Sequence, residues 1–71
     1  MQKNYEKAIE NFTQAMQNDL NPYECHYWRG NAYRDKRDHI RARADYETVL
    51  QLEPDSFLAS LSKKELEQLE E

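Results

Sequence analysis

The feature that most restricts the fold of this chain is a pattern of side chains that recurs after 34 residues. Ala8 recurs as Ala42, and the aromatic Phe12, one helical turn further on, recurs as Tyr46. A small residue followed at this spacing by a large aromatic one describes the packed face of a helix. A fixed period of about 20–50 residues is typical of stacked helical hairpins, which bury a core only against the next unit.

The composition favours one small helical domain. The chain has 71 residues with one Gly and two Pro, so we expect continuous helices and short loops. Hydrophobic residues make up 38% of it and charged residues 34%, which suits a solvated helical stack better than a disordered segment.

Apolar side chains at three- and four-residue spacing predict four helices, over residues 5–19, 22–36, 39–52 and 57–71. The expected N-caps are Asn4, Asn21, Asp38 and Asp55-Ser56, and Pro22 is placed at the first position of the second helix. Pro54 ends the third helix, and the last helix is expected to fray at Glu70 and Glu71. Short connections make neighbouring helices antiparallel.

Two features of the middle helices predict their contacts. Gly30 inside a helix costs about 1 kcal/mol relative to Ala, so we expect another helix to approach it closely, with Ala8 and Ala42 facing it. Two pairs on the third helix are spaced to form exposed i,i+4 ion pairs: Arg41 with Asp45, and Arg43 with Glu47.

Five residues carry a resemblance to a known family: Gly30 and Tyr33 in the second helix, Ala42 and Tyr46 in the third, and Pro54 at its end. With these residues, 23–56 resembles one complete tetratricopeptide repeat, a helix–turn–helix unit. Residues 1–22 resemble the second helix of a preceding repeat, and 57–71 a C-terminal capping helix. The resemblance implies an all-α fold of antiparallel helical hairpins, stacked as a short right-handed solenoid.

Several residues depart from the family pattern. His26 and Arg29 replace the usual bulky residues around the Gly, and Arg37 stands where a turn Gly is common. Val49 replaces a small residue and Arg43 an aliphatic one. We expect these changes to weaken packing within the second unit without breaking its period.

The resemblance implies a scaffold or adaptor that binds a protein or an extended peptide in a concave groove lined by the first helix of each hairpin. The groove residues on the second helix are then Glu24, Tyr27, Asn31, Arg34 and Asp35. Asn can bind a peptide backbone, Arg a carboxylate and Tyr an apolar side chain. The alternative for each of them is an ordinary solvated helix face.

One subgroup of the family binds the acidic C-terminal tails of cytosolic heat-shock chaperones through a clamp of Lys, Asn and Arg. Asn31 matches the first Asn of that clamp, but Trp28 stands at the position of the second. The net charge of −4 also disfavours an acidic ligand. This ligand is therefore not expected.

A second hypothesis is self-association. The first helix has no preceding partner helix, so the stripe of Ala8, Phe12 and Ala15 packs on one neighbour only. We expect either a fragment of a longer array, which is preferred, or a homo-oligomer in which another copy covers this face.

Other functional classes are not expected. The charge of −4 without a basic block disfavours nucleic acid, no apolar run spans a membrane, and the single Cys25 points to the cytoplasm. Cys25 and His26 point about 100° apart on a helix, and His39 has no companion at ligand spacing. We therefore predict no enzyme, no cofactor and no metal site, and assign Trp28 and the tyrosines to packing between helices.

Overall fold

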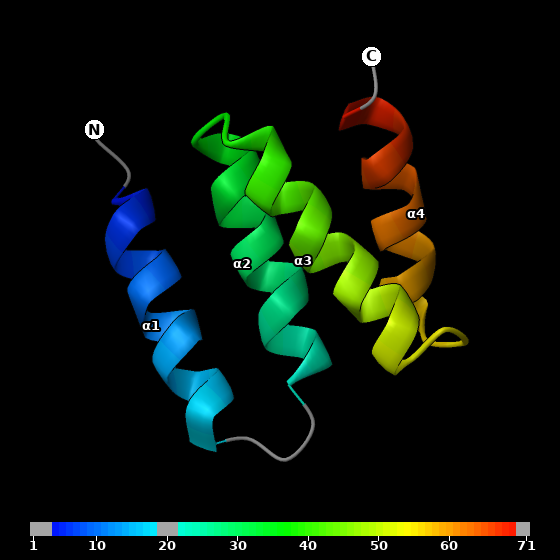
Figure 1. The fold of residues 1–71 in the computed structure, drawn as a ribbon, viewed down its shortest axis with the longest axis horizontal. Helices are drawn as coiled ribbons and strands as arrows, with labels where there is room; N and C mark the ends of the chain where they lie inside the picture. The colour runs from blue at the N-terminus through cyan, green and yellow to red at the C-terminus, as the bar shows by residue number, and fades with distance from the viewer. Residues whose placement is uncertain (1–3, 19–21, 70–71) are drawn as a thin grey trace.

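The computed structural model describes residues 4–18 and 22–69, and within these ranges the regular structure is entirely helical. The helices are α1 (Tyr5–Asn18), α2 (Tyr23–Asp35), α3 (His39–Leu52) and α4 (Phe57–Leu69). Each runs antiparallel to the one before it, and consecutive helices pack against each other (Figure 1). The predicted all-α stack of antiparallel hairpins is confirmed.

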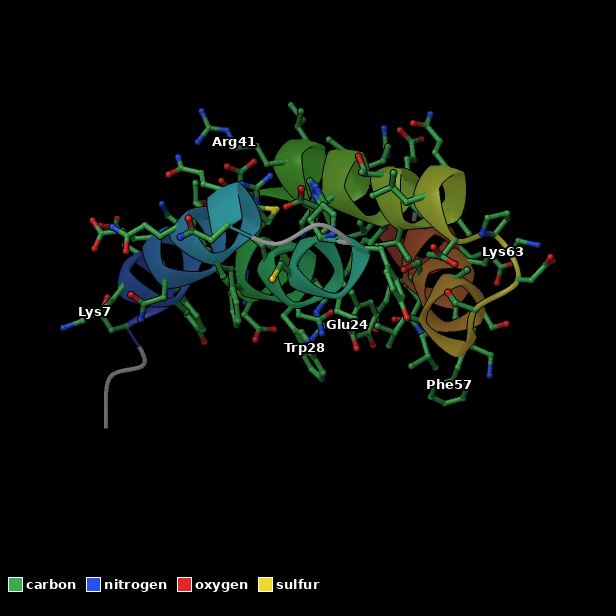
Figure 2. The ribbon with its side chains drawn as sticks, turned by 90° about the horizontal axis from the view of Figure 1, so that it is seen from below. Lys7, Glu24, Trp28, Arg41, Phe57 and Lys63 are labelled. Carbon is green, nitrogen blue, oxygen red and sulfur yellow. The ribbon has the colours of Figure 1, made fainter. Side chains whose placement is uncertain are left out.

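The helices are arranged so that α2 and α4 share one face of the molecule. Figure 2 shows α3 on one side, with α2 and α4 below it, and these two helices also contact each other directly. Glu24 and Trp28 of α2 and Phe57 of α4 project from the side turned away from α3. We call the surface around these three residues the α2–α4 face.

Three of the predicted N-caps are confirmed. The side-chain oxygens of Asn4, Asp38 and Ser56 each accept the backbone N–H of the residue three positions later, at 2.9, 3.3 and 3.0 Å. Pro22 stands immediately before α2 and not at its first position. The predictions for Asp19, Asn21, Glu70 and Glu71 lie outside the described residues.

The backbone of the turn between α2 and α3 gives a reason for the glycine expected at the position of Arg37. Arg37 has φ 71°, in the left-handed region. The Asp38 N–H donates to the carbonyl of Tyr33 at 2.8 Å, and the Arg37 N–H donates to that of Arg34 at 2.9 Å. These two bonds form a Schellman motif, whose left-handed residue is usually Gly.

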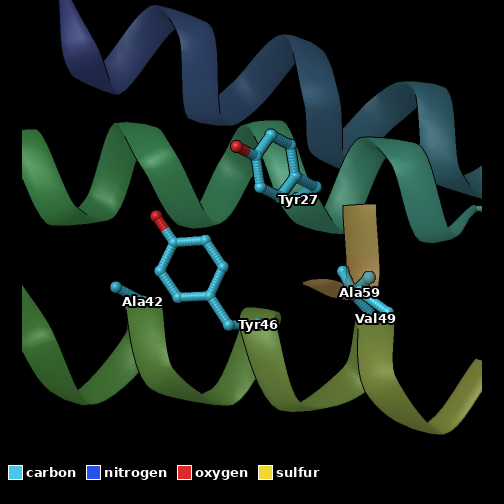
Figure 3. Packing of buried hydrophobic residues seen from close by; sticks show 5 residues of the cluster. All are labelled: Tyr27, Ala42, Tyr46, Val49 and Ala59. Carbon is cyan, nitrogen blue, oxygen red and sulfur yellow. The ribbon is translucent and has the colours of Figure 1, made fainter. Parts of the chain in front are cut away.

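The core lies between α2, α3 and α4 and includes Ala42 and Tyr46, which the repeat predicts. Ala42, Tyr46 and Val49 of α3 are completely buried, and Tyr27 and Ala59 complete the cluster (Figure 3). Among its described residues α1 has none that is buried, so α2 covers the apolar stripe of α1 only partly.

Gly30 is a point of close approach, as predicted, but the neighbours are different. A Cβ added at Gly30 would lie 3.0 Å from Cε1 of Tyr46 and 3.3 Å from Cβ of Asp45. These are the nearest atoms, in place of those expected from Ala8 and Ala42. The missing side chain of Gly30 makes room for a buried aromatic ring.

The prediction of an exposed Arg41–Asp45 pair is wrong. The exposed fraction of Asp45 is 3%, because this side chain points toward α2. Arg41 contacts Asp38 instead, with 3.7 Å between Nε and Oδ2. The predicted Arg43–Glu47 pair is also not found among the described ion pairs, and the buried Nε of Arg43 has no hydrogen-bond partner there.

Asp45 is the centre of a buried polar network that joins three helices. Nε and Nη2 of Arg29 donate to its two carboxylate oxygens at 2.8 and 2.7 Å, and Nδ1 of His26 lies 2.9 Å from Oδ1. Nη1 of Arg29 also donates to the hydroxyl of Thr13 on α1 at 3.1 Å. The hydrogen bond with Asp45 raises the pKa of the Arg29 guanidinium above its ordinary value. Two departures from the family pattern, His26 and Arg29, therefore belong to one charged cluster.

Candidate functional site

All five predicted groove residues lie on α2, but the structure leaves only two of them exposed. Glu24, in the first turn, and Asp35, the last residue of the helix, are both accessible. Glu24 forms no ion pair or hydrogen bond among the described residues. Tyr27, Asn31 and Arg34 are engaged in contacts within the fold.

Tyr27 is part of the core, which corrects its prediction as an open groove residue. Its exposed fraction is 7%, and its ring centroid lies 6.0 Å from that of Tyr46 on α3. It also holds Trp28, since the two rings meet edge to face with centroids 5.0 Å apart. Tyr27 can therefore support the α2–α4 face but cannot itself contact a partner through its ring.

Asn31 is half-buried and accepts a hydrogen bond from the Tyr46 hydroxyl. Burial raises the pKa of that hydroxyl above its ordinary value, against the opposing charge of Arg34, so the group remains a donor at neutral pH. The side-chain oxygen of Asn31 is therefore already engaged in a hydrogen bond within the fold, which competes with binding of a peptide backbone.

Arg34 connects α2 to α4. Its Nη1 lies 2.6 Å from Oε2 of Glu65, and its Nη2 lies 3.2 Å from Oδ1 of Asp35. Burial lowers the pKa of Arg34, but the hydrogen bonds and charges of Glu65 and Asp35 outweigh burial and raise it. This side chain stays charged and is shared between two carboxylates, so it is not available in this conformation to the carboxylate of a ligand.

The structure exposes two aromatic side chains that the sequence interpretation had not placed at the site. Trp28 is 50% exposed and Phe57 is 76% exposed, and both lie on the α2–α4 face (Figure 2). Assigning Trp28 to packing between helices was wrong. The signal for this is that a residue directly after a buried one points about 100° away from it, but the burial of Tyr27 was itself not predicted.

The predicted self-association face is only partly covered. Ala8 and Phe12 are half-buried, Ala15 is exposed, and α2 is the described helix that packs against α1. A second surface thus retains apolar side chains that the fold does not enclose.

The two histidines considered for catalysis or metal binding lie on different helices, and one of them is already bound to another side chain. His26 is held by Asp45, and His39 is exposed at the start of α3. No group of three or more His, Cys, Asp or Glu residues that could hold a metal occurs among the residues searched in 4–18 and 22–69. In the same ranges no helix is long and apolar enough to cross a membrane.

Comparison with protein families identifies the unit to which α2 and α3 belong. The family model described as Tetratricopeptide repeat matches residues 23–56, that is, α2, α3 and the turn that joins them. Comparisons with curated proteins and with solved structures found no match. Repeats of this family are generally modules for interactions between proteins, and typically have no catalytic activity of their own.

Proposed function

We propose that this chain, in which residues 23–56 are a tetratricopeptide repeat, is a protein-binding module that holds a segment of another protein on its α2–α4 face. The observation that carries the proposal is the exposure of Trp28 and Phe57 on one side of the molecule. Tyr27 and Tyr46 are buried, and Tyr23 and Tyr33 pack against the core. The two aromatic residues on this face therefore remain available for a partner.

The geometry of Trp28 suits a binding residue. Its ring is supported at one side by the buried Tyr27, so little side-chain freedom is lost when a partner covers it. Tryptophan is enriched among the residues that carry most of the binding energy in protein interfaces. Glu24 and Asp35 are exposed on the same helix and can offer carboxylates to a partner.

The proposal is tested by selecting binders from a random peptide library and mapping each on the isotope-labelled chain by NMR. We expect amide shifts around Glu24, Trp28, Asn31 and Asp35 and at the start of α4. Trp28→Ala should weaken binding about tenfold or more, as is common for central interface residues. Ile40→Ala is the matched control, because Ile40 is 82% exposed but lies on α3.

The helical content of both variants is checked by circular dichroism. Shifts confined to α1 or α3, or equal losses in Trp28→Ala and Ile40→Ala, would show that the α2–α4 face is not the binding surface.

Self-association through α1 is the second candidate, and it rests on the incomplete burial of this helix. None of its described residues is buried, although Ala8, Phe12 and Ala15 form an apolar stripe. If a second copy covers this stripe, Phe12→Asp should convert an oligomer to a monomer in light scattering. A mass that Phe12→Asp leaves unchanged removes this candidate without affecting the first.

A further inference from the structure

We infer that the partner segment on the α2–α4 face is cationic, and that Glu24 and Trp28 together bind an Arg or Lys side chain of it. The inference rests on the proposed function and adds the chemical class of the partner. Glu24 and Trp28 are four residues apart on α2, so they lie one turn apart on the same side of the helix. Both are exposed, and Figure 2 shows them projecting in the same direction.

The charges on α2 argue against an acidic partner segment over this helix. This helix has two arginines, Arg29 and Arg34. Arg29 is bound to the buried Asp45, and Arg34 is shared between Asp35 and Glu65. Neither guanidinium is free to receive an acidic side chain or a C-terminal carboxylate. Glu24, in contrast, has no cationic partner among the described residues.

The charges next to α2 on this face, without Lys63 and Lys64 of α4, have a negative sum. Arg34 contributes +1, and Asp35, Glu65 and Glu24 contribute −1 each, which gives −2 for the group. The chain as a whole carries −4. A cationic segment is therefore attracted both at long range and at the face itself.

The pairing of a carboxylate with an indole suits a cation. The face of a Trp ring attracts Lys and Arg within about 6 Å of its centroid more strongly than Tyr or Phe does. Arg can in addition stack on the ring while it donates hydrogen bonds to the carboxylate. Since α4 carries the exposed Lys63 and Lys64, we place the cationic residue over α2 and an apolar residue of the partner near Phe57.

The test uses three synthetic hexapeptides in which Leu alternates with Arg, with Gln or with Glu. Trp28 is the one Trp of the chain, so its fluorescence reports binding at this site directly. We expect the Arg peptide to bind at least tenfold more tightly than the Glu peptide, with an affinity that falls as salt is added.

Two variants locate the cation. Glu24→Gln should weaken binding of the Arg peptide about two- to fivefold, as expected for a partly exposed ion pair. Glu47→Gln is the control, because it removes the same charge from an exposed position on α3 and should leave the affinity unchanged. Trp28→Leu, followed with a labelled peptide, should weaken the Arg peptide about two- to fivefold and leave the Gln peptide nearly unaffected.

The outcomes separate the inference from the proposed function. Binding of the Glu peptide as tightly as the Arg peptide, equal effects of Glu24→Gln and Glu47→Gln, or no binding of the Arg peptide would each overturn the cationic partner. Library-selected peptides that still map to the α2–α4 face would in those cases leave the proposed function standing. Selected peptides that map elsewhere would overturn both.

Discussion

Asp45→Ala tests the network that joins α1, α2 and α3. Removing one member of a buried ion pair typically costs about 3–5 kcal/mol, because the remaining charge is left without a partner. In this chain the side chains of Arg29 and His26 are 20% and 19% exposed, so water can partly solvate them after the change. We therefore expect a loss of about 2–4 kcal/mol in the free energy of unfolding.

This loss is large for a chain of 71 residues. Domains have about 0.05–0.15 kcal/mol of stability per residue, which amounts to about 4–11 kcal/mol here. The midpoint of thermal unfolding should fall on the order of 10–20 °C. Urea unfolding followed by circular dichroism gives the free energy and shows, through the slope, whether the transition stays cooperative.

Three further variants make the result specific. Glu47→Ala on the exposed side of α3 should change stability by no more than about 0.5 kcal/mol. Arg29→Met should be destabilising on its own, whereas Arg29→Met with Asp45→Leu should cost less than either single change, because no buried charge is left unpaired. A cost of Asp45→Ala close to that of Glu47→Ala, or strictly additive effects at positions 29 and 45, would refute this account of the network.

Three other predictions concern the turn, the close approach and the buried hydroxyl. Arg37→Gly should raise stability by about 0.5–1 kcal/mol in urea unfolding, because Gly avoids the cost of φ 71° but gains freedom when unfolded; a loss would contradict the left-handed turn. Gly30→Ala should be destabilising by about 1 kcal/mol, because the new Cβ would lie 3.0 Å from the fully buried ring of Tyr46. This steric cost outweighs the better helix propensity of Ala, and a stabilised variant would contradict the close approach. Stability should fall as the pH rises above 10.0, the ordinary pKa of Tyr, because Tyr46 then ionises in the unfolded chain while its raised pKa keeps it protonated in the folded chain. Urea unfolding of Tyr46→Phe across this pH range should show a smaller fall in stability. An equal fall would exclude Tyr46 as the source of the pH dependence.

Features determined by neighbouring residues could be predicted from the sequence. The caps Asn4, Asp38 and Ser56 bind N–H groups three residues away, so the chain itself defines them. The burial of Ala42 and Tyr46 follows from the repeat, because this spacing fixes one face of α3.

Features determined by contacts between helices could not be predicted in the same way. Spacing within α3 suggested that Asp45 pairs with Arg41, but its partner Arg29 lies 16 residues away on α2. The family pattern identified Arg29 as unusual without showing which residue it would meet. Likewise Arg34 was predicted to face a ligand groove, but whether it is available to a ligand depends on Glu65 of α4, which its Nη1 contacts.

The pairing of Arg29 with Asp45 connects the stability of the stack to the chemistry of its surface. Arg29 reaches Thr13 on α1 as well as Asp45 on α3, so it fixes three helices relative to one another. The same contacts remove one of the two cations of α2 from the surface, and the bridge from Arg34 to Glu65 neutralises the other. Among the described residues, Glu24 is thereby left as an unpaired carboxylate one helical turn from Trp28. Arg29, a departure from the family pattern, thus contributes to the rigidity of the stack, and its pairing with Asp45 supports the proposal that the α2–α4 face binds a cation.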